Sequence, residues 1–191
     1  MSSFFKLKRD FYVKRVGVSV QKVTRLFVAS LFGSIIFITR VFVPPPVDKM
    51  LIVVDAVLLA LSGLFIRNVG ATYAGAVGGA LTGLWRPSLL PFSLIYAFLY
   101  GVMVDAFLFL FRVNAKAEGV NRNRLMIAMA LNTLLIGFVT YYATTVFPQL
   151  VLGSPTMDML VAFMGPVTGS VAGYAAAYLW NRYLKNISVA S

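Results

Sequence analysis

Six long apolar segments, separated by short loops, constrain this chain more than any other feature. They cover residues 26–43, 50–66, 71–85, 89–111, 125–147 and 159–180. A hydrocarbon core about 30 Å thick requires roughly 20 helical residues per crossing. Because 60% of the 191 residues are apolar and only 12% are charged, a soluble domain of this size would lack the interior to bury them. We predict an all-α membrane protein, a bundle of six transmembrane helices.

The Lys and Arg residues indicate how this bundle is oriented. Fourteen of the seventeen fall in the N-terminal segment, in alternate loops and in the tail, which places them on one side of the predicted membrane. The three on the other side are Arg40, Lys49 and Arg86. Cytoplasmic loops carry an excess of Lys and Arg, so we predict a multi-pass protein of the cell (plasma) membrane with both termini cytoplasmic. Its expected parts are a basic cytoplasmic or interfacial segment (1–25), a transmembrane domain (26–184) and a cytoplasmic tail (185–191).

The residue types that most enzymes and metal sites use are missing or scarce. The chain has no His, no Cys and only six acidic residues, which removes the commonest general base, thiol chemistry and the preferred ligands of transition metals. We therefore predict no enzymatic activity, no metal and no cofactor. The net charge of +11 is expected to face membrane lipids, whose anionic headgroups attract basic residues next to a membrane span, and no nucleic acid.

Asp55 lies inside the second apolar segment, about one third of the way from its outer end. A charge within a span costs about 2.5 to 3.5 kcal/mol on insertion scales, so it requires a partner or a function. We expect Asp55 either to pair with Arg40 or Lys49 or to serve an outer binding site, and both alternatives stay open.

Two further acidic residues lie within or at the start of later segments. Asp105 is near the cytoplasmic end of the fourth segment, where we expect a structural ion pair with Arg67 or Arg112. Asp158 begins the sixth segment, where a carboxylate stabilises a helix N-terminus. A contact with ligand is the alternative role for Asp158.

Aromatic and polar side chains gather at the predicted outer level of the bundle. They are Trp85, Arg86, Tyr96, Tyr141 and Tyr142. An interfacial belt of Trp and Tyr explains most such residues in membrane proteins, whereas a small-molecule pocket needs aromatic walls and a few convergent polar groups. Asn132, about a third of the way along the fifth segment, adds an amide that must find a partner if it is buried.

Two segments carry small residues at strict four-residue spacing. The third has Ala71, Gly75, Gly79 and Gly83, and the sixth has Gly165, Gly169, Gly173 and Ala177. Small residues on one helix face let membrane helices approach closely. We expect tight helix packing at both stripes, and the alternative is a smooth face for a conformational change or a partner.

The first half of the chain resembles a known family in its pattern. A basic start leads into RLFVASLFGSIIFITRVFVPPP (25–46), and the Gly-rich stretch NVGATYAGAVGGALTGLWRPSLLPFSLIYAFLYGV (68–102) follows the second segment. This order resembles the S component, the substrate-binding membrane subunit, of energy-coupling factor (ECF) transporters for vitamins and other micronutrients. Ala29 and Gly33 match the family's pair of small residues four apart, with Gly in place of the usual second Ala.

The resemblance implies a function. It implies capture of a small-molecule nutrient from the outer side, followed by coupling to a separate transmembrane subunit and two ATPase subunits, with Ala29 and Gly33 as partner contacts. The candidate substrate-binding residues are Trp85, Arg86, Tyr96, Tyr142, Asp158 and Asp55. Arg86 would suit an anionic nutrient, whereas Asp158 with the aromatic residues would suit a cationic one. The alternative function is a structural or accessory subunit of a larger membrane complex, without a ligand of its own.

Overall fold

The computed structural model describes residues 23, 26–42, 51–67, 69–87, 90–115, 119–146 and 155–185. The described residues form six helices and no strand. These are a first helix (Leu26–Phe42), α3 (Ile52–Phe65), α4 (Gly70–Trp85), α5 (Leu90–Leu110), α6 (Arg122–Val146) and α7 (Pro155–Leu179), which continues into a π-helical turn, η2 (Trp180–Leu184). Most of the predicted N-terminal segment and tail, together with Lys49, lies outside the described residues.

Each of the six predicted apolar segments is helical, which confirms that part of the prediction. Within the described ranges, three stretches are long and apolar enough to cross a membrane: Pro91–Leu110, Arg122–Ala143 and Asp158–Leu184. The other helices are shorter, with 14 residues in α3 and 16 in α4. At 1.5 Å per residue these two reach about 21 Å and 24 Å. The described part of the chain is thus helical, with three stretches of membrane-spanning length and composition.

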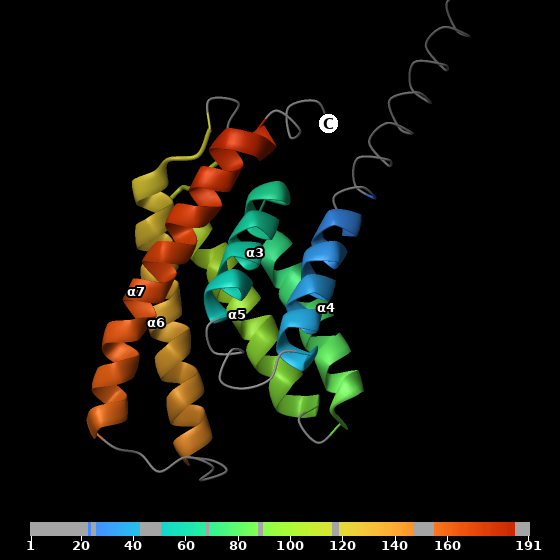
Figure 1. The fold of residues 1–191 in the computed structure, drawn as a ribbon, viewed down its shortest axis with the longest axis vertical. Coiled ribbons are helices and arrows are strands. Elements are labelled where there is room, and N and C mark those ends of the chain that lie inside the picture. The colour runs from blue at the N-terminus through green and yellow to red at the C-terminus, as the bar shows by residue number, and fades with distance from the viewer. Residues whose placement is uncertain are drawn as a thin grey trace, which may run out of the picture.

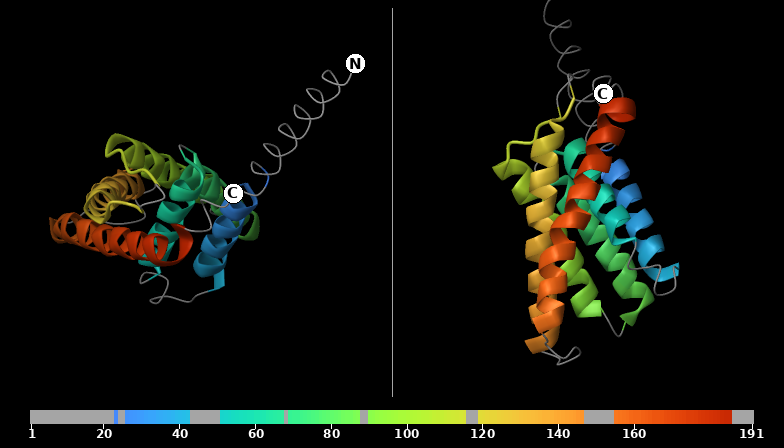
Figure 2. Two further views of the ribbon diagram at one scale, coloured as in Figure 1. Left: turned by 90° about the horizontal axis from the view of Figure 1, so that it is seen from above. Right: turned by 60° about the vertical axis from the view of Figure 1, so that its left-hand side comes forward.

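The helices pack side by side as a bundle (Figures 1 and 2). In Figure 1 the α6–α7 pair lies on one side, the first helix and α4 on the other, and α3 and α5 between them. The α3–α4 turn, the α5–α6 loop and the C-terminal end of α7 lie together at one end, which we call the basic end. Its described basic residues are Arg67, Arg112, Arg122, Arg124, Arg182 and Lys185. The opposite end, where the first helix and α4 terminate, has Arg40 and Arg86.

The small residues of α4 contact a helix on each side. A Cβ added at Gly79 would lie 2.8 Å from Ala97 Cβ of α5, and one at Gly78 would lie 3.0 Å from the carbonyl oxygen of Gly33 in the first helix. The corresponding atom at Gly75 would collide with the carbonyl oxygen of Ala97. Helix backbones can approach this closely only where side chains are absent, so the expected tight packing is confirmed for α4.

The stripe on α7 packs in the same way, but only against α6. A Cβ at Gly165 would lie 3.0 Å from Leu134 Cα, and one at Gly173 would lie 2.8 Å from Met126 Cα. The opposite face of α7 is apolar and exposed, with Met159 at 75% and Phe163 at 71%. An exposed apolar surface of this kind is suited to lipid rather than water.

Candidate functional site

Asp55 is buried between the first helix and α3, where both of its carboxylate oxygens accept a hydrogen bond. The guanidinium Nε of Arg40 donates to Asp55 Oδ2 at 2.8 Å, and the Thr39 hydroxyl donates to Asp55 Oδ1 at 2.9 Å. The Asp55 side chain is 8% exposed and that of Arg40 is 30% exposed. Of the two expectations for Asp55, the structure contains the pair with Arg40, and it joins two helices of the bundle.

Trp85 and Arg86 also contact the first helix. The Trp85 ring lies 5.7 Å from the ring of Phe42 and 6.4 Å from that of Phe37, centroid to centroid. The Arg86 Nη2 donates to the carbonyl oxygen of Val41 at 3.3 Å, and so satisfies one of the orphan carbonyls at that helix end. These two residues therefore hold the C-terminal ends of the first helix and α4 together.

The remaining predicted substrate residues lie on α5, α6 and α7. The Tyr142 hydroxyl donates to Asp158 Oδ1 at 3.3 Å, which joins the last turns of α6 to the first turn of α7. Tyr96 stacks on Phe92, one turn earlier in α5, at 6.2 Å. Among the six predicted substrate residues, Tyr142 and Asp158 are hydrogen bonded to each other. The contacts described for Asp55, Trp85, Arg86 and Tyr96 are made with residues outside this set.

Ala29 and Gly33, the predicted partner contacts, are buried within the bundle. Ala29 is 1% exposed, and a Cβ at Gly33 would lie 2.7 Å from the carbonyl oxygen of Ala74 and 2.9 Å from Val77 Cβ. Helix α4 thus covers Gly33 and its face of the first helix. A partner subunit would reach this face only if the first helix moved away from α4.

The expected ion pair of Asp105 with Arg67 or Arg112 is wrong. Its carboxylate instead accepts from the backbone N–H groups of Ala71 at 3.2 Å and Thr72 at 2.7 Å, and from the Thr72 hydroxyl at 2.7 Å. These donors belong to the first turn of α4, which has free N–H groups and a partial positive charge. A carboxylate from α5 therefore caps the N-terminus of α4, a long-range contact that sequence spacing does not reveal.

Three buried polar side chains have no hydrogen-bond partner among the residues that the structure describes. They are the Tyr100 hydroxyl on α5, both ends of the Asn132 amide on α6 and the Trp180 indole N–H. Asn132 and Trp180 are completely buried, and Tyr100 is 7% exposed. The sequence drew attention to Asn132 but not to Tyr100. The signal for Tyr100 was its place in the middle of an apolar segment, away from the interfacial level where Tyr is common.

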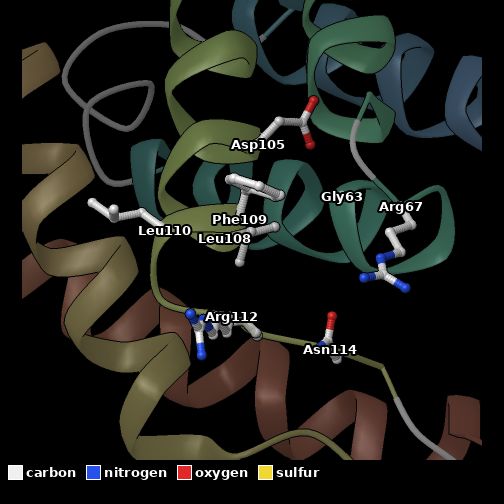
Figure 3. A pocket seen from close by; sticks show the side chains of 9 residues that line it. Gly63, Arg67, Asp105, Leu108, Phe109, Leu110, Arg112 and Asn114 are labelled. Carbon is white, nitrogen blue, oxygen red and sulfur yellow. The ribbon is translucent and has the colours of Figure 1, made fainter.

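A cavity of about 430 Å³ opens at the basic end (Figure 3). It is lined by Gly63, Arg67, Asp105, Leu108, Phe109, Leu110, Arg112, Val113 and Asn114. The close-up shows Arg67 and Asn114 facing each other across the opening, with Arg112 on the α5 side and Asp105 further from Asn114. The site predictions did not include this cavity, because its walls come from the ends of α3 and α5 and from the loop after α5.

Arg112 ends α5 in an unusual backbone conformation. Val113 N–H donates to the carbonyl oxygen of Leu108 and Arg112 N–H to that of Phe109, the pattern of a Schellman motif, whose left-handed position normally holds Gly. Arg112 takes that position with a φ of 50°. For a residue with a side chain, this conformation costs about 1 kcal/mol or more relative to Gly.

Among the described residues, no group of three or more acidic side chains is placed to hold a metal ion. Comparison of the chain with models of protein families, with curated proteins and with solved structures finds no match.

Proposed function

We propose that this chain is the substrate-binding subunit of an ECF-type uptake transporter for a vitamin or related micronutrient. In this proposal it spans the plasma membrane six times with both termini in the cytoplasm. It captures its nutrient from the outer side and works with a coupling transmembrane subunit and two ATPase subunits. The order of the basic start, the first apolar segment and the Gly-rich stretch supports the choice of family.

The distribution of charge supports the proposed orientation. Six described basic residues lie at the basic end and two at the opposite end, as expected if the basic end is cytoplasmic. Helices as short as α3 can cross where the bilayer thins locally. The chain has no Cys, so single cysteines can report topology directly. We expect a membrane-impermeant maleimide to label Ser88→Cys but not Asn121→Cys in intact cells, and the reverse pattern would contradict this orientation.

The observation that carries the binding function is the pair of unpartnered polar groups at Tyr100 and Asn132. Tyr100 lies ten residues before the last residue of α5, and Asn132 ten residues after the first residue of α6. Both are therefore about 15 Å from the basic end, at similar depth in adjacent helices. Leaving a buried polar group unsatisfied costs about 1–3 kcal/mol. A polar solute that reached either group would supply its missing hydrogen bonds.

The test compares ligand retention with stability in matched variants. Wild type, Asn132→Leu and Tyr100→Phe are purified in mild detergent and examined by native mass spectrometry and thermal unfolding. Because Leu keeps the branching at Cγ and removes two unsatisfied polar groups, we expect Asn132→Leu to unfold at the same or a higher temperature and to lose the small molecule retained by wild type. Gly137→Ala, on the same helix but away from these groups, should retain it.

The partner subunits are tested in the same preparation. We expect wild type to copurify with a second membrane subunit and two ATPase subunits. If wild type retains no small molecule, and no such subunits associate with it in native membranes, the transporter proposal is wrong.

A second function is favoured by a different observation. Asp55, Asp105 and Arg86 all make bonds that join helices within this chain, as expected of a structural or accessory subunit of a larger membrane complex. This candidate predicts a stoichiometric membrane partner without ATPases and without a bound small molecule, which the same native mass spectra would distinguish.

A further inference from the structure

We propose that the cavity at the basic end binds a phosphate group through Arg67, Arg112 and Asn114. The arginines of the cavity lie at the end of the bundle, about 15 Å along the helices from Tyr100 and Asn132, so the proposal does not depend on the transporter function. The phosphate group has two possible sources, the headgroup of an anionic phospholipid and a soluble phosphate compound.

The charges in the cavity favour an anion. Both Arg67 and Arg112 are exposed, and neither guanidinium has an ion pair or hydrogen bond among the described residues. The one acidic group of the lining, Asp105, already accepts three hydrogen bonds from the first turn of α4. Two guanidinium groups thus remain available, and their planar fork of donors suits the oxygens of phosphate. The Asn114 side-chain amide adds another potential donor across the opening (Figure 3).

The backbone of Arg112 is a second, independent observation. Gly would occupy its left-handed position without strain, yet the chain has Arg there with a φ of 50°. Strained positions of this kind cluster at functional sites, where a side chain has a use other than stability. The guanidinium at the rim of the cavity offers such a use.

The walls of the cavity suit a molecule with an apolar part. Phe109 is 75% exposed and Leu110 is 69% exposed at the end of α5, whereas Leu108 beside them is buried. Exposed apolar side chains next to guanidinium groups at a bundle end match the level where phospholipid headgroups meet acyl chains. A soluble phosphate compound would use the arginines and leave these two side chains uncovered.

The experiment measures binding by the full-length protein in lipid nanodiscs. One arm replaces part of the phosphatidylcholine with phosphatidylglycerol and counts retained lipids by native mass spectrometry. The other arm titrates inorganic phosphate in phosphatidylcholine nanodiscs at constant ionic strength. Retention of phosphatidylglycerol alone supports the lipid headgroup, and a phosphate-dependent rise in unfolding temperature supports a soluble ligand.

The variants separate binding from folding. Arg112→Gly removes the guanidinium and relieves the backbone, so we expect unfolding about 2–4 °C higher without ligand and about tenfold weaker binding, as for the loss of one charge-assisted hydrogen bond. Arg67→Gln should weaken binding similarly. Arg124→Gln, at the same end but outside the cavity lining, should bind as wild type. The proposal is overturned if wild type binds neither probe, if Arg112→Gly binds unchanged, or if Arg124→Gln loses as much as the cavity variants.

Discussion

The glycines of helix α4 pack against two helices and those of helix α7 against one, although both helices carry small residues at four-residue spacing. Gly75 of α4 faces α5 and Gly78 faces the first helix. Gly165 and Gly169 of α7 face only α6. Helix α7 also contacts α3, and much of its remaining surface is apolar and exposed. The two helices also differ in length, with 16 residues in α4 and 25 in α7.

The N-terminal turns of these helices differ in a related way. The first turn of α4 is bonded to a buried carboxylate from another helix, Asp105. The first turn of α7 contains its own acid, Asp158, which is partly exposed and bonded to Tyr142. The short helix α4 takes its N-terminal cap from a neighbouring helix. The long helix α7 carries an acidic residue in its own first turn, and its exposed apolar face is suited to lipid. Four substitutions test this difference, from the largest expected effect to the smallest.

Gly169→Ala in α7 should destabilise the protein most, by about 3 kcal/mol, towards the upper end of the range for overpacking. A Cβ here would collide with the carbonyl oxygen of Met129 and the Thr133 hydroxyl and lie 2.8 Å from Ala130 Cα. The free energy of unfolding would be measured by denaturation in mixed micelles. In the control, Gly137→Ala, the new Cβ meets only Val161 Cγ1 at 3.2 Å, so a near-neutral change is expected. Equal losses in both variants would contradict the contact-based explanation.

Gly75→Ala in α4 should lower the free energy of unfolding by about 2 kcal/mol. Its Cβ would collide with one backbone atom, the carbonyl oxygen of Ala97, and lie 3.5 Å from Gly101 Cα. Because Gly101 leaves space on α5, part of the clash can be relieved by a small shift. Chemical denaturation under the conditions used for α7 gives the comparison, and a loss exceeding that of Gly169→Ala would reverse the proposed order.

Asp105→Asn should destabilise the protein by about 1.5 kcal/mol, because Asn retains an acceptor for the first turn of α4 but loses the charge that favours a helix N-terminus. Thermal unfolding of Asp105→Asn, Thr72→Val and the double variant measures the coupling between the two side chains. Strict additivity would show that the hydrogen bond from the Thr72 hydroxyl to Asp105 Oδ2 contributes no pairwise stability.

Asp158→Asn should have the smallest effect, within about 0.5 kcal/mol. Its bond to Tyr142 is 3.3 Å long and exposed, and exposed polar pairs contribute little. The measurement is the unfolding temperature relative to wild type. If Asp158→Asn destabilises as much as Asp105→Asn, the distinction between the two helix N-termini is lost.

The helices themselves could be predicted from the sequence. Runs of apolar residues bounded by Pro, Gly and basic residues marked all six, and α4 and α5 begin and end within one residue of the prediction. The packing function of the two glycine stripes followed from their four-residue spacing. These features depend on neighbours along the chain, which a sequence records directly.

The partners of the polar residues could be predicted only in part. Arg40 was one of two expected partners for Asp55, and the structure contains that bond. For Asp105 the nearest charges along the chain suggested an ion pair, whereas the buried carboxylate instead meets backbone N–H groups 33 and 34 positions away in sequence. Which face of one helix meets which turn of another depends on how each helix is rotated about its axis and how far it is shifted along that axis. Neither quantity can be read from neighbouring residues in the sequence.

By itself the sequence determined six helices, their apolar character and the separation of basic from poorly charged loops, because each depends on local composition and helical period. Only the tertiary structure decided that Gly33 faces α4, that Tyr100 and Asn132 have no described partner, and that Arg67 and Arg112 share a cavity. The physical reason is that burial and pairing arise between helices, where a side chain's environment is set by residues distant along the chain.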